Sequence, residues 1–214
     1  MFSSEWFVNS LTLKRNQVVS LNELNVDHSA SDYWISIGDG VLRLFVIHEI
    51  SGEAFTIGFF SKEKIYFPAH QFEGLEVKLE ALTSVSIDAN FVQDQDNIDV
   101  YKHYLSCLSL INWSLALSMI ACSKTTEQKI ERLIVMLIFH FGTREKIGYR
   151  LPFIITHLRI SEILGCTRST VTRIILSLRE NHLMDVEGVD RAWLVSKQLM
   201  DRHEKFISVF FASI

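Results

Sequence analysis

Cysteine and proline are scarce in this sequence, which has three cysteines and two prolines among its 214 residues. Cys107, Cys122 and Cys166 are odd in number and widely spaced, so they predict neither a disulfide framework nor a CxxC metal site. The first ten residues lack the basic and apolar regions of a secretory signal peptide. These absences favour the reducing cytoplasm as the compartment.

Sequence motifs of catalysis are also lacking. No GxSxG, HExxH, P-loop or GxGxxG pattern occurs in the chain, so we predict that the protein is not an enzyme. His28, His48, His70 and His103 have no i,i+4 pairing and no evident second ligand. We therefore predict that the chain has no metal site.

Basic residues are few in the first half of the chain and gather in the second. Residues 1–100 contain 6 Lys and Arg against 15 Asp and Glu, whereas residues 144–182 contain 7 against 3. The net charge of the whole chain is −4, so the protein is not uniformly basic. This asymmetry favours a polyanionic partner for the basic segment. With 48% hydrophobic residues, the chain can form one large or two small folded domains.

Short strands separated by turns dominate the expected structure of the first hundred residues. Runs of aromatic and β-branched residues predict strands at 33–37, 41–47 and 54–60 and a late strand at Leu79–Ile87. Turn residues separate them at Gly38-Asp39-Gly40 and Ser51-Gly52-Glu53. This spacing is typical of a small antiparallel barrel or roll. We therefore predict an α+β protein in which residues 1–97 form an antiparallel β-roll.

One long helix is predicted over residues 98–123. A stripe of mainly apolar residues follows one of its faces, and its members are Tyr101, Leu105, Leu108, Asn112, Leu115, Met119 and Cys122. A stripe of this kind favours packing against the same helix of a second copy, so we predict a homodimer. Asn112 either fixes the register of that pairing or faces solvent beside it.

The same helix contains Tyr104–Ser123, a stretch of 20 residues without a charge, which is long enough to span a bilayer. Five serines and Asn112 within it, and the lack of a clear basic cluster at either end, favour a dimerisation helix instead. We therefore predict no contact with a membrane. Cys107 and Cys122 are interpreted as small packing residues of this helix rather than redox switches.

Two short helices joined by a glycine turn are predicted between Thr156 and Arg179. Thr156 and Thr167 can cap the two helices, and Gly165 permits the sharp turn between them. One face of the second helix is apolar, formed by Val171, Ile174, Ile175 and Leu178. This is the geometry of a helix-turn-helix, whose second helix enters the major groove of DNA.

Flanking elements predict a winged helix over residues 124–214. A helix from Thr125 or Thr126 to Phe141 comes before the two short helices, with Gly142 as its stop. After them, residues 183–186 and 192–195 predict a two-stranded wing.

Polar side chains of the two short helices are the predicted DNA contacts. Arg168 and Arg173 can each donate two hydrogen bonds to guanine, which is worth about 1–3 kcal/mol of discrimination per contact. Hydroxyl groups at helix N-termini can bond phosphate oxygens. The predicted phosphate contacts are Thr156, His157, Thr167, Thr170 and Arg191.

The segment Gly165-Cys166-Thr167-Arg168-Ser169-Thr170-Val171-Thr172-Arg173-Ile174 resembles the helix-turn-helix signature of the CRP/FNR superfamily of bacterial regulators. With Phe141-Gly142 upstream, it is most similar to the cyanobacterial nitrogen-control branch. The resemblance implies a homodimeric transcriptional regulator that binds pseudo-palindromic double-stranded DNA, with RNA polymerase as a further partner. It implies base readout by Arg168, Ser169 and Arg173. Because Ser169 is too short to copy the glutamate contact of the cyclic-AMP receptor, we expect a different half-site.

The roll lacks the residues of the cyclic-nucleotide site that occurs in this family. That site resembles Gly-Glu followed by Arg-Ser/Thr-Ala, and Ile65–Gly74 does not contain it. No arginine occurs from Leu44 to Glu131, and Lys62, Lys64 and Lys78 lie among glutamates. A buried anion needs a charge-assisted donor, so we predict that neither cyclic AMP nor cyclic GMP binds and that there is no cofactor. The same absence disfavours the 2-oxoglutarate site that the nitrogen-control branch implies. An alternative function is a protein-interaction module in which the roll docks a partner protein.

Overall fold

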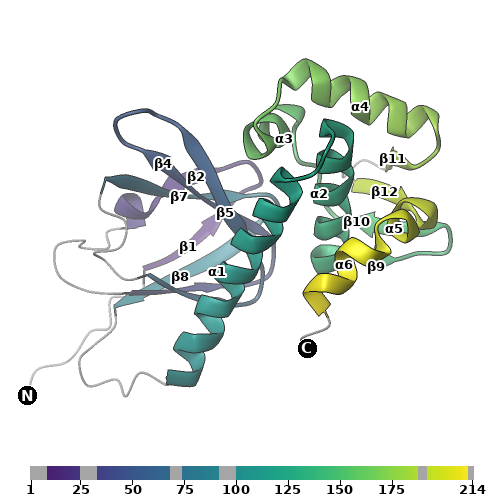
Figure 1. Ribbon diagram of the computed structural model, residues 1–214. Helices are drawn as coiled ribbons and strands as arrows, with labels where there is room; N and C mark the ends of the chain where they lie inside the picture. Colours follow the sequence, from purple (N-terminus) through teal and green to yellow (C-terminus); the bar gives the residue numbers. More distant parts are fainter. Residues whose placement is uncertain (1–8, 25–32, 68–73, 92–99, 188–191, 212–214) are drawn as a thin grey trace, which may run out of the picture. The chain divides into compact units, whose positions relative to one another are not determined.

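The computed structural model describes residues 9–24, 33–67, 74–91, 100–187 and 192–211, and in residues 100–106 it describes the backbone alone. The chain forms two compact units, Met1–Trp113 and Ser114–Ile214, which are treated separately below. The division falls within the long helix α1 (Val100–Ala121). Figure 1 labels most of the helices and strands of both units.

Two four-stranded antiparallel sheets make up the β structure of the first unit. One has the order β1 (Asn9–Leu13), β8 (Val85–Phe91), β3 (Tyr33–Ile37) and β6 (Lys64–Phe67). The other has the order β2 (Val18–Ser20), β7 (Leu75–Ala81), β4 (Leu42–His48) and β5 (Ala54–Phe60), and the short helix η1 (Leu21–Leu24) follows β2. The strands predicted at 33–37, 41–47 and 54–60 are confirmed to within one residue.

The prediction of a single strand at Leu79–Ile87 is wrong, because the chain turns in the middle of this segment. Strand β7 ends at Ala81 and β8 begins at Val85, and the two strands belong to different sheets. Hydrogen bonds to Val41 hold the turn: the Leu82 amide donates to the Val41 carbonyl over 2.9 Å, and the Val41 amide donates to Thr83 Oγ1 over 2.7 Å. Leu82 lies in the turn but is apolar and buried, as the neighbouring strand residues are. The hydrophobic pattern of the sequence therefore does not reveal the turn.

The part of helix α1 that belongs to the first unit packs against strand β5 through Trp113. The Trp113 ring lies edge-on to Phe59, with 5.2 Å between the ring centroids. Gly58 permits this approach, since a Cβ atom at that position would lie 2.7 Å from Trp113 Cβ. Within the described part of the chain, none of the helices combines the length and the apolarity that a bilayer crossing requires.

The second unit is built around helix α2 (Thr126–Phe141). Thr125 caps it by accepting a hydrogen bond from the Gln128 amide, and Gly142 ends it, as predicted. Helices α3 (His157–Leu164) and α4 (Arg168–Glu180) lie beside each other next to α2 (Figure 1). Two short C-terminal helices, α5 (Lys197–Arg202) and α6 (Glu204–Phe211), contact α2 as well.

The wing belongs to a wider sheet than the sequence predicted. Strands β11 (Met184–Glu187) and β12 (Ala192–Ser196) pair as expected. Two further strands, β10 (Gly148–Leu151) and β9 (Thr143–Arg144), extend the sheet beyond β12. The four strands hold the end of α2 and the start of α5 to the base of the wing, because β9 follows α2 and β12 leads into α5.

A buried carboxylate joins the C-terminal helices to α2. Glu131 of α2 is 3% exposed, and its two oxygens accept hydrogen bonds from Arg202 Nη1 over 2.7 Å and from His203 Nε2 over 2.8 Å. Burial alone would raise the pKa of Glu131, but the hydrogen bond from His203 and the charges of His203 and Arg202 outweigh it and lower the pKa. The ionised carboxylate therefore stabilises the packing of the helices around α2.

Candidate nucleic-acid interface

Helices α3 and α4 form the predicted helix-turn-helix, and their boundaries agree with the sequence prediction. Thr156 Oγ1 caps α3 by accepting a hydrogen bond from the Arg159 amide over 3.2 Å. Gly165 ends α3 in the left-handed conformation, with φ 61° and ψ 44°, which a residue without Cβ adopts at little cost. Thr167 then caps α4 through the Thr170 amide. The turn therefore has the caps and the glycine that its local sequence predicts.

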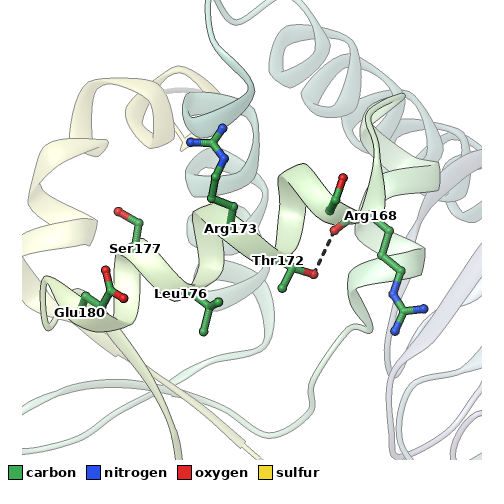
Figure 2. Close-up of a pocket in the computed structure, with 7 residues that line it drawn as sticks. Arg168, Thr172, Arg173, Leu176, Ser177 and Glu180 are labelled. Carbon is green, nitrogen blue, oxygen red and sulfur yellow. Dashed lines mark hydrogen bonds between the residues drawn. The ribbon is translucent and has the colours of Figure 1, made fainter.

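One face of α4 is fixed by burial and the other faces outward. The apolar residues Val171, Ile174, Ile175 and Leu178 are all buried, as predicted. Seven other residues of the helix line an open hollow on its outer side (Figure 2), and these are Arg168, Ser169, Thr172, Arg173, Leu176, Ser177 and Glu180. Because the buried face cannot rotate away from the core, the outward residues are presented in a fixed orientation.

The two arginines predicted to contact bases are both exposed on this outward surface. Among the described residues, no acidic side chain forms an ion pair with Arg168 or Arg173. By contrast, Arg159 of α3 pairs with Glu162 over 2.9 Å, and Arg179 of α4 pairs with Asp185 over 3.1 Å. The guanidinium groups of Arg168 and Arg173 therefore remain available to an external acceptor. Figure 2 shows that the two groups leave the helix in different directions.

A cluster of hydroxyl groups surrounds the start of α4. Thr167 Oγ1 lies 2.9 Å from both Ser169 Oγ and Thr170 Oγ1, and it accepts from the Thr170 amide over 3.2 Å. Thr167 and Ser169 are exposed, and Thr170 is half-buried. Hydroxyls beside the positive end of a helix dipole are suitable ligands for phosphate oxygens. Arg191, the other predicted phosphate contact beyond α4, lies outside the described residues.

His157 connects the two helices rather than extending away from them. Its Nδ1 lies 2.9 Å from Thr172 Oγ1, and the Thr172 hydroxyl donates to the Arg168 carbonyl over 3.0 Å. Since that hydroxyl has a single proton, His157 Nδ1 is the donor in the first of these bonds. Burial and the charge of Arg168 lower the pKa of His157. The neutral ring therefore carries its proton on Nδ1, and Nε2 can only accept a hydrogen bond.

The predicted dimerisation stripe is largely uncovered within the single chain. Leu115 is 51% exposed, Asn112 and Cys122 are exposed, and Leu108 and Met119 are half-buried. The side chains of Tyr101 and Leu105 lie outside the described part of the structure.

A different face of α1 is buried, through Trp113, Ala116 and Ile120. The sequence analysis missed Ile111, which is 58% exposed next to Asn112. Ile111 is three positions after Leu108 and four before Leu115, so helical spacing from these two members of the stripe would have found it.

The roll holds one arginine in the opposite environment. Arg43 is 0% exposed, and its Nη1 donates to Glu80 Oε2 over 2.7 Å. Its Nε and Nη2 both donate to Thr56 Oγ1, over 2.9 and 2.8 Å, and the guanidinium lies 4.5 Å from the centre of the Phe45 ring. The sequence analysis did not single out Arg43, which comes directly before the segment without arginine. Its position was visible in the sequence, but its pairing with Glu80 and Thr56 was not.

Comparison with known proteins gives a weak sequence match. No protein-family model matches the chain. A curated relative from Porphyra purpurea, named "Putative HTH-type transcriptional regulator ycf28", is 27% identical over 121 residues, which make up 56% of this chain and 48% of that protein. The match therefore spans about half the length of the relative.

Solved structures give a stronger match to the fold. TTHB099, a CRP-family transcriptional regulator from Thermus thermophilus, is 16% identical, with a TM-score of 0.68 over 91% of this chain and 96% of that one. A CooA mutant from Carboxydothermus hydrogenoformans is 14% identical, with a TM-score of 0.66 over 93% and 87% of the two chains.

TTHA1359, a CRP/FNR-family regulator also from Thermus thermophilus, is 16% identical, with a TM-score of 0.62 over 90% and 98%. These likenesses confirm the predicted α+β fold class. They also confirm, at the level of the fold, the predicted resemblance to CRP/FNR regulators.

Proposed function

We propose that this chain is a sequence-specific DNA-binding transcriptional regulator that acts as a homodimer on a pseudo-palindromic site. The observation that carries the proposal is the state of Arg168 and Arg173, which are exposed on one helix whose opposite face is buried. Long charged side chains without an internal partner are suited to an external polyanion. The named relative and the fold of the solved regulators support the same function.

In this proposal α4 enters the major groove and reads bases through its first two turns. Arg168 and Arg173 each donate a pair of hydrogen bonds to guanine O6 and N7. Ser169, the third proposed base contact, lies between them on the outward surface. Its hydroxyl can donate or accept a hydrogen bond, so it can bond to more than one kind of base. Ser169 therefore contributes less discrimination between bases than either arginine.

Phosphate contacts position the helix in the groove. Thr167 and Thr170 lie at the start of α4, and Thr156 lies at the start of α3, so their hydroxyl groups flank the proposed base-reading residues. Arg191, between β11 and β12 in the sequence, completes the proposed set. His157 is left out of it, because its Nε2 can only accept a hydrogen bond and an ionised phosphate oxygen has no proton to donate. Because phosphate contacts are common to all sequences, they contribute affinity and salt dependence but little specificity.

The proposed dimer supplies the second half-site. Ile111 and Leu115 are large apolar residues that are more than half exposed on α1, and a second copy of α1 would remove both from water. A symmetric dimer places its two recognition helices about 34–36 Å apart on one side of the duplex. The bound sequence is therefore expected to be an inverted repeat with one helical turn between its half-site centres.

Selection of bound duplexes from a random pool, using the full chain, tests the proposal. We expect an inverted repeat, and we expect the Arg168→Ala/Arg173→Ala variant to lose its preference for the selected duplex over random DNA. The matched control is Arg159→Ala/Arg179→Ala, which removes two charges that are paired within the protein. This control should keep the sequence preference. A pool without any enriched sequence would contradict the proposal and favour a module that docks a protein.

A further inference from the structure

Leu176 is an exposed apolar residue on the otherwise polar outward surface of α4. It is 48% exposed, whereas the other apolar residues of this helix, Val171, Ile174, Ile175 and Leu178, are all buried. It is also the one apolar residue among those that line the hollow on the outer side of the helix. Figure 2 shows its side chain on that side, between Thr172 and Glu180.

Leu176 lies next to Arg173, a proposed base contact. Arg173 precedes it by three positions and Thr172 by four, which places all three residues on adjoining parts of one helix surface. If α4 lies in the major groove as proposed above, Leu176 loses its contact with water on binding. An apolar side chain placed there gains free energy only from an apolar group of the DNA.

The major groove offers one such group. Among the base edges displayed there, the C5 methyl of thymine is apolar, and the others are hydrogen-bond donors and acceptors. Aliphatic side chains recognise thymine by contact with this methyl. We propose that Leu176 is a specificity-determining residue that selects thymine, an inference that rests on the proposed function of α4.

Helix geometry gives the position of this thymine relative to the guanine of Arg173. Three residues advance a helix by about 4.5 Å, and base pairs of B-DNA are stacked about 3.4 Å apart. Leu176 therefore reaches a base pair one or two steps from the one contacted by Arg173. Glu180, one turn further along, is an acid that phosphate groups would repel, so the reading surface ends near Leu176.

Replacement of thymine by deoxyuridine tests the proposal, since it removes the methyl group and changes none of the hydrogen-bonding groups of the base. The selected duplex is made with deoxyuridine at one thymine position at a time, and its affinity is measured for the wild-type protein and for Leu176→Ala. We expect one position in each half-site at which uracil weakens wild-type binding by about fourfold, the effect of one buried methyl-sized group. The Leu176→Ala variant should bind the thymine and uracil duplexes equally at that position.

Leu158→Ala is the matched control, because Leu158 is 50% exposed but lies on α3. It should keep the wild-type preference for thymine over uracil. If the wild-type protein enriches a sequence but no position shows a uracil penalty that Leu176→Ala removes, the proposal for Leu176 is overturned and the proposed function stands. If no sequence is enriched, both fail together.

Discussion

Arg43 in the roll and Arg173 in α4 carry the same guanidinium group in opposite surroundings. Arg43 is fully buried, with Glu80 and Thr56 occupying all three of its nitrogens. Arg173 is exposed and, among the described residues, has no ion-pair partner. A buried charge must be neutralised inside the protein, whereas an exposed one is free to bind an external anion. The comparison teaches that the environment of an arginine, rather than its presence, indicates whether it holds the fold together or binds a ligand.

The largest expected effect comes from breaking the internal pair of the roll. In Arg43→Ala, the buried Glu80 carboxylate loses its partner, and we expect the free energy of unfolding to fall by about 3–5 kcal/mol. Arg173→Ala, in contrast, should change it by less than about 0.5 kcal/mol, because Arg173 is exposed and forms no ion pair with any residue that the structure describes. Urea denaturation followed by circular dichroism measures both values. Equal stability of the two variants would remove the distinction between the arginines.

A double variant sharpens this test by removing both charges of the pair. Arg43→Met/Glu80→Leu leaves no unpaired buried charge, so it should recover most of the stability lost in Arg43→Ala. A double variant as unstable as the single one would mean that the packing of the arginine stem, rather than its charge, is what the roll requires.

Glu131 is the buried carboxylate of the second unit that compares with Glu80 of the roll, and the direction in which pH changes its contribution to stability can be predicted. Glu131→Gln should lower the free energy of unfolding by roughly 1.5–3 kcal/mol at pH 7, because two charge-assisted hydrogen bonds weaken. Since folding lowers the pKa of Glu131 below its ordinary 4.5, this contribution is complete above pH 4.5 and disappears as the pH falls through the lowered value. Urea denaturation of both proteins from pH 7 to pH 3 should show their difference shrinking with acid.

Glu127→Gln is the control for that titration, because Glu127 is exposed on the same helix. It should change the stability by less than about 0.5 kcal/mol at every pH. A Glu131→Gln difference that stays constant down to pH 3 would contradict the assigned role of the ionised carboxylate.

A smaller effect is expected when the two kinds of proposed DNA contact are compared. Arg173→Ala should relax the preference at one base pair by about 1–3 kcal/mol. Arg191→Ala should weaken binding to the selected and the random duplex alike and reduce the slope of log affinity against log salt by about 1. Electrophoretic shift titrations at three salt concentrations separate the two outcomes. Equal losses on both duplexes for both variants would refute the division into base and phosphate contacts.

Local features of the fold were predictable from the sequence, because neighbouring residues determine them. Thr156 and Thr167 form helix caps through amides three positions away, and Gly165 has the positive φ that its place between the helices requires. The buried face of α4 also followed from its spacing alone. These features define the two helices of the candidate interface, so the backbone of α3, the turn and α4 was predicted, while the roles of the side chains stay predictions.

Features that depend on distant residues were not predictable in this way. The strand prediction at Leu79–Ile87 failed because the pairing of β7 and β8 with different sheets leaves no mark in the alternation of side chains. Arg43 and Glu80 are 37 residues apart, and Glu131 and Arg202 are 71 apart. A buried ion pair needs both partners at one place, and the sequence shows each partner separately.

The smallest expected effect is the absence of a response to cyclic nucleotides. The buried phosphate of such a ligand needs a guanidinium inside the roll. Arg15 is exposed in a turn, and Arg43 could serve only by leaving Glu80 unpaired, at a cost of several kcal/mol. We therefore expect neither saturable heat in calorimetry nor a rise in melting temperature when cyclic AMP or cyclic GMP is added to millimolar concentration. A micromolar complex would overturn this prediction. If that complex persisted in Arg43→Met/Glu80→Leu, the anion would be bound by other residues of the roll, and the contrast between Arg43 and Arg173 would still hold.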